Sequence, residues 1–348
     1  MLTSMPDQAL ARKRIFTLSR AWFTVMLVAL VACAVPVHAQ KSKVYRVAFI
    51  AALTPVSELS GADPVNLAAR AFVHGLRDLG YVEGRNLILD IRTLGGRYER
   101  TPEILGDIVR LRPDVIFSSS QIVVERHLKA AAGIPMVTVA SWSLVETGMA
   151  QSLARPGGTV TGFIMDVDAG VEAKRIELLR ETIPGARRVA YLGHPLAWES
   201  ALGKRVLEAA GKLGISLFHV SYTGTDLDAA FASIEREASD AVFVPFGSTS
   251  FANRQRIGQF VSAKRLPCIA AYREIVEHGC LMSYGVDVND VHRRAAGYVA
   301  KILEGAKPGE LPIEQPTRFE LVVNMRQAKA LGLRIPQSIM LRADRVIE

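Results

Sequence analysis

Residues 188–193 read RVAYLG, a short apolar run that is rich in residues favouring β-strands and ends in glycine. Three comparable runs follow it: ISLFHVSY at 215–222, AVFVPFG at 241–247 and PCIAAY at 267–272. Successive runs begin 26 or 27 residues apart, which leaves room for one helix in each interval. Strands that alternate with helices at this spacing predict βαβ units and a parallel sheet.

The N-terminal half of the chain repeats this pattern. Its runs are VYRVAFIAAL at 44–53, LILDIRTL at 87–94, DVIFSSS at 114–120 and PMVTVAS at 135–141. Apolar side chains at helical spacing lie between runs and predict four helices: 67–79, 176–183, 227–238 and 291–302. The sequence therefore predicts an α/β fold with two doubly wound lobes of about four parallel strands each, at about 44–160 and 163–285.

The segment SLARPGGTVTGF, residues 152–163, lies where the two halves meet. Its glycines fit neither the G-x-x-x-x-G-K-[ST] nor the G-x-G-x-x-G phosphate pattern, and Arg155 precedes them. We interpret Pro156–Gly158 as a turn and residues 159–163 as the first crossing between the halves. Gly162 is expected where a ligand or another strand approaches the backbone closely.

The N-terminus predicts export. Arg12, Lys13, Arg14 and Arg20 precede an uncharged run at 21–35, and Val37-His38-Ala39 then offers a small-x-small cleavage site. This is the pattern of a secretory signal peptide over 1–39, which predicts a periplasmic protein. A lipoprotein box ending at Cys33 is the alternative, with the mature protein anchored at that lipidated cysteine.

Charge and cysteine content narrow the function classes. Beyond residue 39 the chain has 38 basic and 33 acidic residues and no dense basic run, so we expect no nucleic-acid partner. Cys268 and Cys280 are the cysteines left after cleavage, and either a disulfide or two buried thiols fits them. No Cys/His cluster suggests a metal, and we expect no cofactor.

Parallel sheets bind ligands beyond the carboxyl ends of their strands, and those ends are rich in hydroxyls and aromatic rings here. The candidate binding residues are Thr54, Ser118, Ser119, Ser120, Ser141, Trp142, His194, Phe246, Gly247, Ser248, Thr249, Tyr272, Tyr284 and Asp287. Structural roles compete with binding, since the serines can cap a helix and Asp287 can start one. The chain has no G-x-S-x-G or H-E-x-x-H motif, so we expect no catalytic residue and no enzyme.

Seven further stretches of the chain are informative together: GLRDLGYVEGRNL, RPDVIF, IPMVTVA, VETGMAQSLARPGGTVTGF, KRIELLRETIPGARRVAYL, LMSYGVD and the block from Ala295 to Ile347. With these stretches the chain resembles the ABC transporter substrate-binding proteins, a large bacterial family with a type I periplasmic-binding fold. The resemblance implies two lobes joined by crossover strands, with 44–161 and about 287–316 in lobe 1 and 162–286 in lobe 2. Residues 317–348 complete the lobes without a clear assignment.

The resemblance also implies a function. We expect a monomeric solute-binding protein that closes on a small molecule, an amino acid or aromatic compound among the candidates, and delivers it to an inner-membrane ABC permease, with the ATPase only indirectly involved. Relatives often have Asp-Pro where this chain has Trp142-Ser143-Leu144, which puts a shared ligand in doubt. The alternatives are an exported ligand sensor of the same fold and a secreted serine hydrolase.

Overall fold

The computed structural model describes residues 43–131, 133–141, 143–165 and 169–348. The strands are β1 (Tyr45–Ala51), β2 (Leu87–Thr93), β3 (Val115–Ser118), β4 (Met136–Ala140), β5 (Val160–Ile164), β6 (Arg188–Gly193), β7 (Ser216–Ser221), β8 (Ala241–Val244), β9 (Cys268–Ala270), β10 (Met282–Gly285), β11 (Glu320–Asn324) and β12 (Arg345–Ile347). The α-helices are α2 (Val56–Leu59), α3 (Leu67–Asp78), α4 (Thr101–Leu111), α5 (Gln121–Ala130), α6 (Ala169–Thr182), α7 (Pro195–Glu199), α8 (Ala201–Lys212), α9 (Asp228–Arg236), α10 (Ser248–Ala252), α11 (Arg254–Ala263), α12 (Arg273–Glu277), α13 (Val288–Leu303), α14 (Met325–Leu331) and α15 (Gln337–Met340). Two 3₁₀ turns, η1 (Tyr98–Arg100) and η2 (Pro308–Glu310), complete the elements described.

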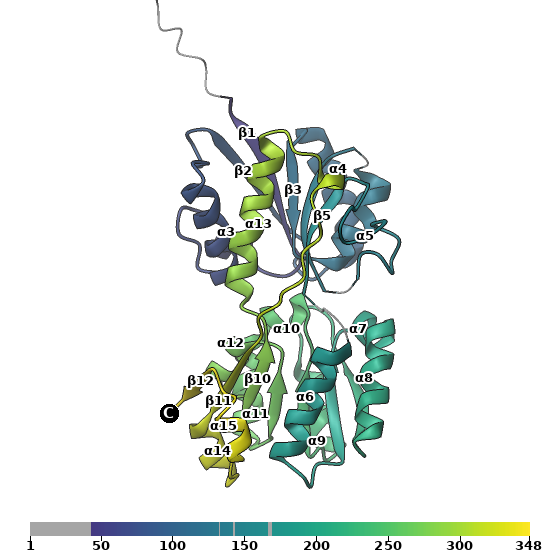
Figure 1. Ribbon diagram of the computed structural model, residues 1–348, viewed down its shortest axis with the longest axis vertical. Helices are drawn as coiled ribbons and strands as arrows, with labels where there is room; N and C mark the ends of the chain where they lie inside the picture. The colour runs from purple at the N-terminus through teal and green to yellow at the C-terminus, as the bar shows by residue number, and fades with distance from the viewer. Residues whose placement is uncertain (1–42, 132, 142, 166–168) are drawn as a thin grey trace, which may run out of the picture. The chain divides into compact units, whose positions relative to one another are not determined.

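The first sheet has the strand order β2-β1-β3-β4-β5, and all its neighbours are parallel. Helices α3 and α13 lie beside each other against one face, and α4 and α5 cover the other (Figure 1). Alternate β1 residues serve the two faces, since Phe49 packs with Phe72 of α3 whereas Ile50 packs in the cluster that holds Ile104 of α4. This sheet and its four helices form lobe 1 in the description below.

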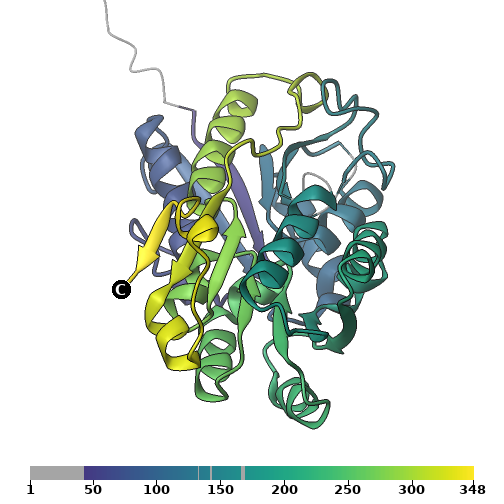
Figure 2. The same cartoon turned by 60° about the horizontal axis from the view of Figure 1, so that its bottom comes forward.

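The second sheet has the strand order β12-β11-β10-β9-β8-β6-β7. Its neighbours are parallel except for β10 and β11, which run antiparallel. The C-terminal strands β11 and β12 extend this sheet beside β10, as both views show (Figures 1 and 2). This sheet and its flanking helices form lobe 2, which carries more strands than the four predicted.

The predicted α/β fold with parallel sheets is confirmed, and the four helices expected from apolar spacing are α3, α6, α9 and α13. Helix α3 begins where Asn66 Oδ1 accepts a hydrogen bond from the Ala69 backbone N–H at 3.0 Å. Helix α13 begins in the same way at Asp287, whose Oδ1 accepts from Asn289 and Asp290. Both helices follow the carboxyl end of a strand in the sequence, α3 after β1 and α13 after β10. In folds of this kind the region beyond such strand ends lines the binding site.

The expectation that residues 159–163 cross between the halves is wrong. Residues 160–164 form β5, the edge strand of the first sheet, so the chain leaves lobe 1 only after this strand. Gly162 has φ +131° and lies so close to β4 that an added Cβ would meet the Thr138 carbonyl oxygen at 2.1 Å. A neighbouring strand therefore explains this glycine.

The connection that follows α13 returns along β5 before it enters lobe 2. Glu314 forms a parallel bridge with Phe163, and its backbone N–H donates to the Gly162 carbonyl oxygen at 2.8 Å. The chain then reaches β11 through residues 315–319. A second connection, residues 286–287, joins β10 to α13.

Cys268 and Cys280, for which the sequence left two states open, form a disulfide with a Cα–Cα distance of 5.0 Å. Both cysteines are fully buried in the core of lobe 2. Within the described ranges, no helix has the length and apolar character needed to cross a membrane. The predicted signal peptide, its cleavage site and Cys33 lie outside the described residues.

Candidate functional site

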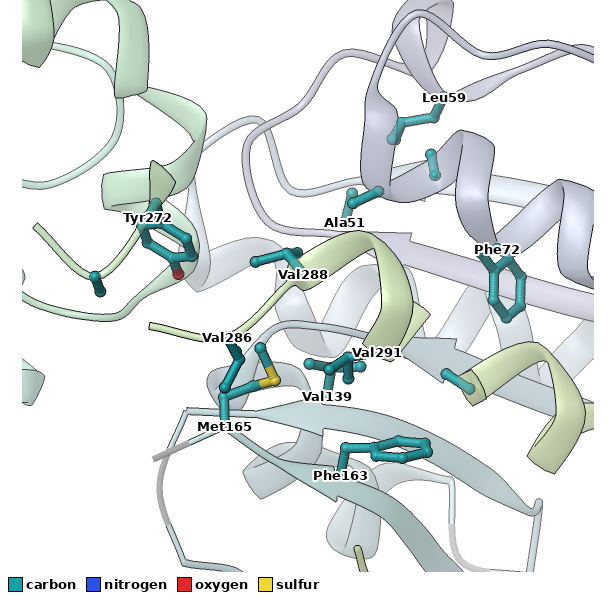
Figure 3. Close-up of a cluster of buried hydrophobic side chains, with 14 of the residues drawn as sticks. Ala51, Leu59, Phe72, Val139, Phe163, Met165, Tyr272, Val286, Val288 and Val291 are labelled. Atoms are coloured by element: carbon teal, nitrogen blue, oxygen red, sulfur yellow. The ribbon is translucent and has the colours of Figure 1, made fainter. Parts of the chain in front are cut away.

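Loops at the carboxyl ends of both sheets face each other across a cleft that contains two neighbouring chambers. We call the first the apolar chamber, because most of its lining side chains are hydrocarbon or aromatic. Its lining residues are Phe49, Ala51, Ala52, Leu53, Thr54, Leu59, Asn66, Ala68, Ala69, Ser119, Val139, Phe246, Ser248, Phe251, Tyr272, Val288 and His292. In Figure 3 Tyr272 of lobe 2 lies across from Val288 and Ala51 of lobe 1.

The second space is the polar chamber, in which hydroxyl groups and loop backbone are concentrated. Its lining residues are Tyr98, Ser120, Ile122, Ser141, His194, Leu196, Ala197, Pro245, Phe246, Gly247, Ser248, Thr249 and Ser250. Phe246 and Ser248 line both chambers, so the two spaces adjoin at these side chains. The cavity volume is about 60 Å³ in the apolar chamber and about 40 Å³ in the polar one.

Three aromatic rings of lobe 2 form one side of the apolar chamber. The Tyr272 ring lies 5.0 Å from that of Phe246 and 5.2 Å from that of Phe251, between ring centroids. The Tyr272 hydroxyl donates to the Gly247 carbonyl oxygen at 3.0 Å and accepts from the Gly247 N–H at 2.9 Å. These bonds tie the β9 end to the β8 loop, and burial raises the pKa of Tyr272 well above its usual value.

One ring contact joins the lobes at the polar chamber. Tyr98 follows β2 in lobe 1 and lies edge-on to His194 of lobe 2, with centroids 5.5 Å apart. Burial raises the pKa of Tyr98 to about 12. Burial also lowers the pKa of His194, and nearby His219 adds to the effect. Both rings are therefore neutral near pH 7, and they can meet without an unpaired charge.

His292 is a buried polar side chain at the lobe 1 end of the apolar chamber. Its ring lies edge-on to Phe117, with centroids 5.8 Å apart, and it is 5% exposed. Nδ1 lies 2.8 Å from the carbonyl oxygen of Val288, one turn earlier in α13. Burial lowers the pKa of His292 to about 4, so the ring is neutral in the native protein above that pH.

A charged cluster holds the connections between the lobes and lies outside both chambers. Arg273 contacts Asp287 at 3.0 Å and Glu320 at 3.1 Å, so one guanidinium contacts the starts of α13 and β11. Arg273 and Asp287 also line a separate cavity of about 440 Å³ with Arg294, Arg318 and Asp344. Because Arg273 follows Tyr272 directly, this cluster adjoins the cleft through one peptide bond.

Most of the predicted site residues lie in the chambers. Thr54, Ser119, Phe246, Ser248 and Tyr272 line the apolar chamber, and Ser120, Ser141, His194, Phe246, Gly247, Ser248 and Thr249 line the polar one. Ser118 is buried behind them, where its Oγ donates to the Ile50 carbonyl oxygen and accepts from the Ser120 N–H. Trp142 lies outside the described residues.

Two predicted residues lie away from the chambers. The Tyr284 ring stacks on Phe319, with centroids 5.6 Å apart, beside the connection to β11. Asp287 caps α13 and pairs with Arg273, which is the helix-starting role that competed with ligand binding.

Sequence reasoning missed residues of two kinds. Tyr98 follows the β2 end by five residues, and a wider reading of that loop would have included it. Val288 and His292 lie in the first turns of α13, where helical periodicity marks them as ordinary core positions. No group of three potential metal ligands occurs among the residues described.

The chain is similar in sequence to a known protein family and to a protein of known ligand. The model of the family described as ABC transporter substrate binding protein matches residues 55–347. A tyrosine-binding protein of Clostridioides difficile is 24% identical over 288 residues, which cover 80% of each chain.

Two solved structures share the fold. A conserved domain protein from Vibrio cholerae is 26% identical, with a TM-score of 0.76, and the match covers 87% of this chain and 100% of that one. An ABC domain from Streptococcus pneumoniae in complex with L-Trp is 19% identical, with a TM-score of 0.75 and coverages of 88% and 100%.

Proposed function

The chain belongs to the family of ABC transporter substrate-binding proteins, which are binding proteins and not enzymes, and we propose that it binds an aromatic amino acid between its lobes for import. In this proposal the signal peptide exports the protein to the periplasm. The loaded, monomeric protein then delivers its ligand to an inner-membrane permease.

The adjoining chambers are the observation that carries this proposal. An aromatic amino acid has an apolar ring at one end and a charged, hydrogen-bonding amino-acid group at the other. The cleft has one chamber suited to each end. Phe49, Phe246 and Val288 offer contact area to a ring, whereas Ser120, Ser248 and Thr249 offer hydroxyls to the polar end. The named relatives that bind tyrosine and tryptophan support this choice of ligand class.

Closure of the lobes supplies the coupling between binding and delivery. Residues of both lobes line each chamber, so a ligand held there contacts both lobes and favours an arrangement closed around it over an open one. We propose lobe boundaries that follow the sheets: 44–164 with about 287–316 for lobe 1, because β5 belongs to the first sheet, and 169–286 for lobe 2. The placement of β11 and β12 in the second sheet supports adding residues 317–348 to lobe 2.

Thermal unfolding of the mature protein tests the ligand class. L-tyrosine, L-tryptophan and L-phenylalanine are compared with L-leucine, sugars and nucleosides, each with a titration to obtain Kd. A ligand at 100 times its Kd stabilises the native state by about 2.7 kcal/mol, which raises Tm by several degrees. A response to sugars or nucleosides, with none to the aromatic amino acids, would overturn the proposed ligand class.

Uptake by the bacterium that produces the protein tests the importer role. Deleting the gene should reduce uptake of the radiolabelled ligand, and the native gene should restore it. Unchanged uptake in the deletion strain would argue against import while leaving ligand binding intact.

A further inference from the structure

The neutral His292 side chain has one ring nitrogen that the protein does not use. A carbonyl oxygen can only accept a hydrogen bond, so Nδ1, 2.8 Å from the Val288 oxygen, must carry the proton. In a neutral imidazole the other nitrogen, Nε2, then has a lone pair and accepts. Among the described residues, no hydrogen-bond partner reaches Nε2.

The position of His292 makes this acceptor available to a ligand. Its Nδ1 edge faces the α13 backbone, which leaves the Nε2 edge farther from the helix, and the side chain lines the apolar chamber. Neighbouring lining groups include Phe49, Ala69 and Val288, which offer no side-chain donor. Asn66 also lines the chamber and has a side-chain NH2 donor, but among the described residues it makes no hydrogen bond to His292.

We propose that His292 Nε2 accepts a hydrogen bond from an O–H or N–H group on the ligand's ring and so selects rings that carry such a donor. This inference rests on the proposed function, since it assumes that the ring of an aromatic amino acid occupies the apolar chamber. The phenol of tyrosine and the indole of tryptophan have a donor of this kind, and the phenyl ring of phenylalanine has none.

Rings with a donor should bind more tightly than rings without one, because leaving the Nε2 acceptor buried without a hydrogen bond costs free energy. A ring without a donor would cover Nε2 and remove it from water without replacing the lost hydrogen bond. Sites built to bind a substrate hydroxyl discriminate strongly against the analogue that lacks it, for this reason. Burial also favours the neutral ring over the imidazolium, and a protonated Nε2 would donate instead of accepting.

Calorimetric titration with two matched ligand pairs tests the proposal. The pairs are L-tyrosine with L-phenylalanine and L-tryptophan with 1-methyl-L-tryptophan, whose methyl group replaces the indole proton. The native protein should bind the donor-bearing member of each pair about tenfold or more tightly. In His292→Phe, the ratio within the tyrosine pair should fall to about one.

His127→Phe is the matched control. His127 is also buried and bonds through Nε2 to a carbonyl oxygen, that of Ile134, at 3.0 Å, but it lines neither chamber. Its ligand ratios should equal those of the native protein. Equal binding of both members of each pair by the native protein, or an unchanged ratio in His292→Phe, would overturn the proposal.

Nitrogen NMR of the native protein gives a second readout if His292→Phe does not fold. With ¹⁵N-labelled histidine, a neutral imidazole protonated at Nδ1 should show an Nε2 resonance that moves with tyrosine and much less with phenylalanine. An Nε2 resonance indifferent to tyrosine, although calorimetry shows binding, would overturn the acceptor role and leave the proposed function standing. Failure of all four ligands to bind would overturn the proposed function and this inference together.

Discussion

The apolar and polar chambers meet at Phe246 and Ser248, yet lobe 1 builds them from different parts. Its contribution to the polar chamber comes from loops just beyond β2, β3 and β4, which carry Tyr98, Ser120 and Ser141. Its contribution to the apolar chamber includes the first turns of α3 and α13, where Ala69 and His292 lie. Strand-end loops therefore supply hydroxyls and backbone to the polar chamber, whereas the helix starts supply hydrocarbon, the Asn66 amide and the His292 imidazole to the apolar one.

Removing the side chain shared by both chambers should have the largest effect on binding. In Phe246→Ala, the ring that adjoins both spaces is lost, and the affinity for an aromatic amino acid should fall about 100-fold. Calorimetric titration measures the change. Phe218→Ala, a half-buried ring of β7 that lines neither chamber, is the control and should change affinity less than threefold.

The apolar chamber should also contribute to the pH dependence of stability, through His292. Its pKa is about 4 in the folded protein and about 6.5 when unfolded, so the unfolded state binds more protons between these values. Its contribution is present above pH 6.5 and is lost as pH falls toward 4, with about 2 kcal/mol gone by pH 5.

Chemical unfolding of the native protein and of His292→Phe at pH 7 and pH 5 measures this contribution. The native protein should lose about 2 kcal/mol more than the variant over this interval. His278→Gln, which removes an exposed histidine, should lose as much as the native protein does. Parallel losses in the native protein and His292→Phe would show that the histidine is not held neutral by burial.

A substitution in the polar chamber should lower the affinity for all aromatic amino acids by the same factor. Ser120 is 1% exposed and lines this chamber, so Ser120→Ala removes a hydroxyl from the end that binds the common amino-acid group. Affinities for tyrosine and phenylalanine should both fall about tenfold, with their ratio unchanged. A change in the ratio would mean that the ring, not the amino-acid group, contacts Ser120.

An exposed ion pair between the lobes, which lines neither chamber, should matter least for binding. Arg205 of lobe 2 lies 3.8 Å from Glu146 of lobe 1, with 41% and 55% of the two side chains exposed. Exposed ion pairs contribute little, so Arg205→Ala should weaken binding less than threefold, and less again in high salt. A tenfold loss of affinity in Arg205→Ala would mean that this ion pair, and not the contacts in the chambers, contributes most to binding.

The sequence predicts the fold and the polar chamber better than the apolar one, for a physical reason. Strand ends can be read from apolar runs, and parallel sheets place such ends at one edge, so Ser120, His194 and Thr249 were accessible to reasoning. His292 occupies a position of α13 that also fits a buried helix face, and its role depends on a tautomer fixed by contact with Val288.

The place of β5 in the first sheet was equally hard to predict from the sequence. Residues 160–164 have the β-branched character expected of any strand, and only the pairing with β4 shows which sheet they join. The charged cluster around Arg273 could not be predicted from the sequence either. Asp287 and Glu320 are distant from each other in the sequence, and both contact Arg273 only in the folded chain.

A crystal structure of the protein with L-tyrosine tests the central claim most directly. The account predicts the ring in the apolar chamber, beside Phe49 and Val288, with its hydroxyl at His292 Nε2 and its amino-acid group beside Ser120 and Thr249. The reverse orientation, or tyrosine bound in the cavity that Arg273 and Arg318 line, would contradict it.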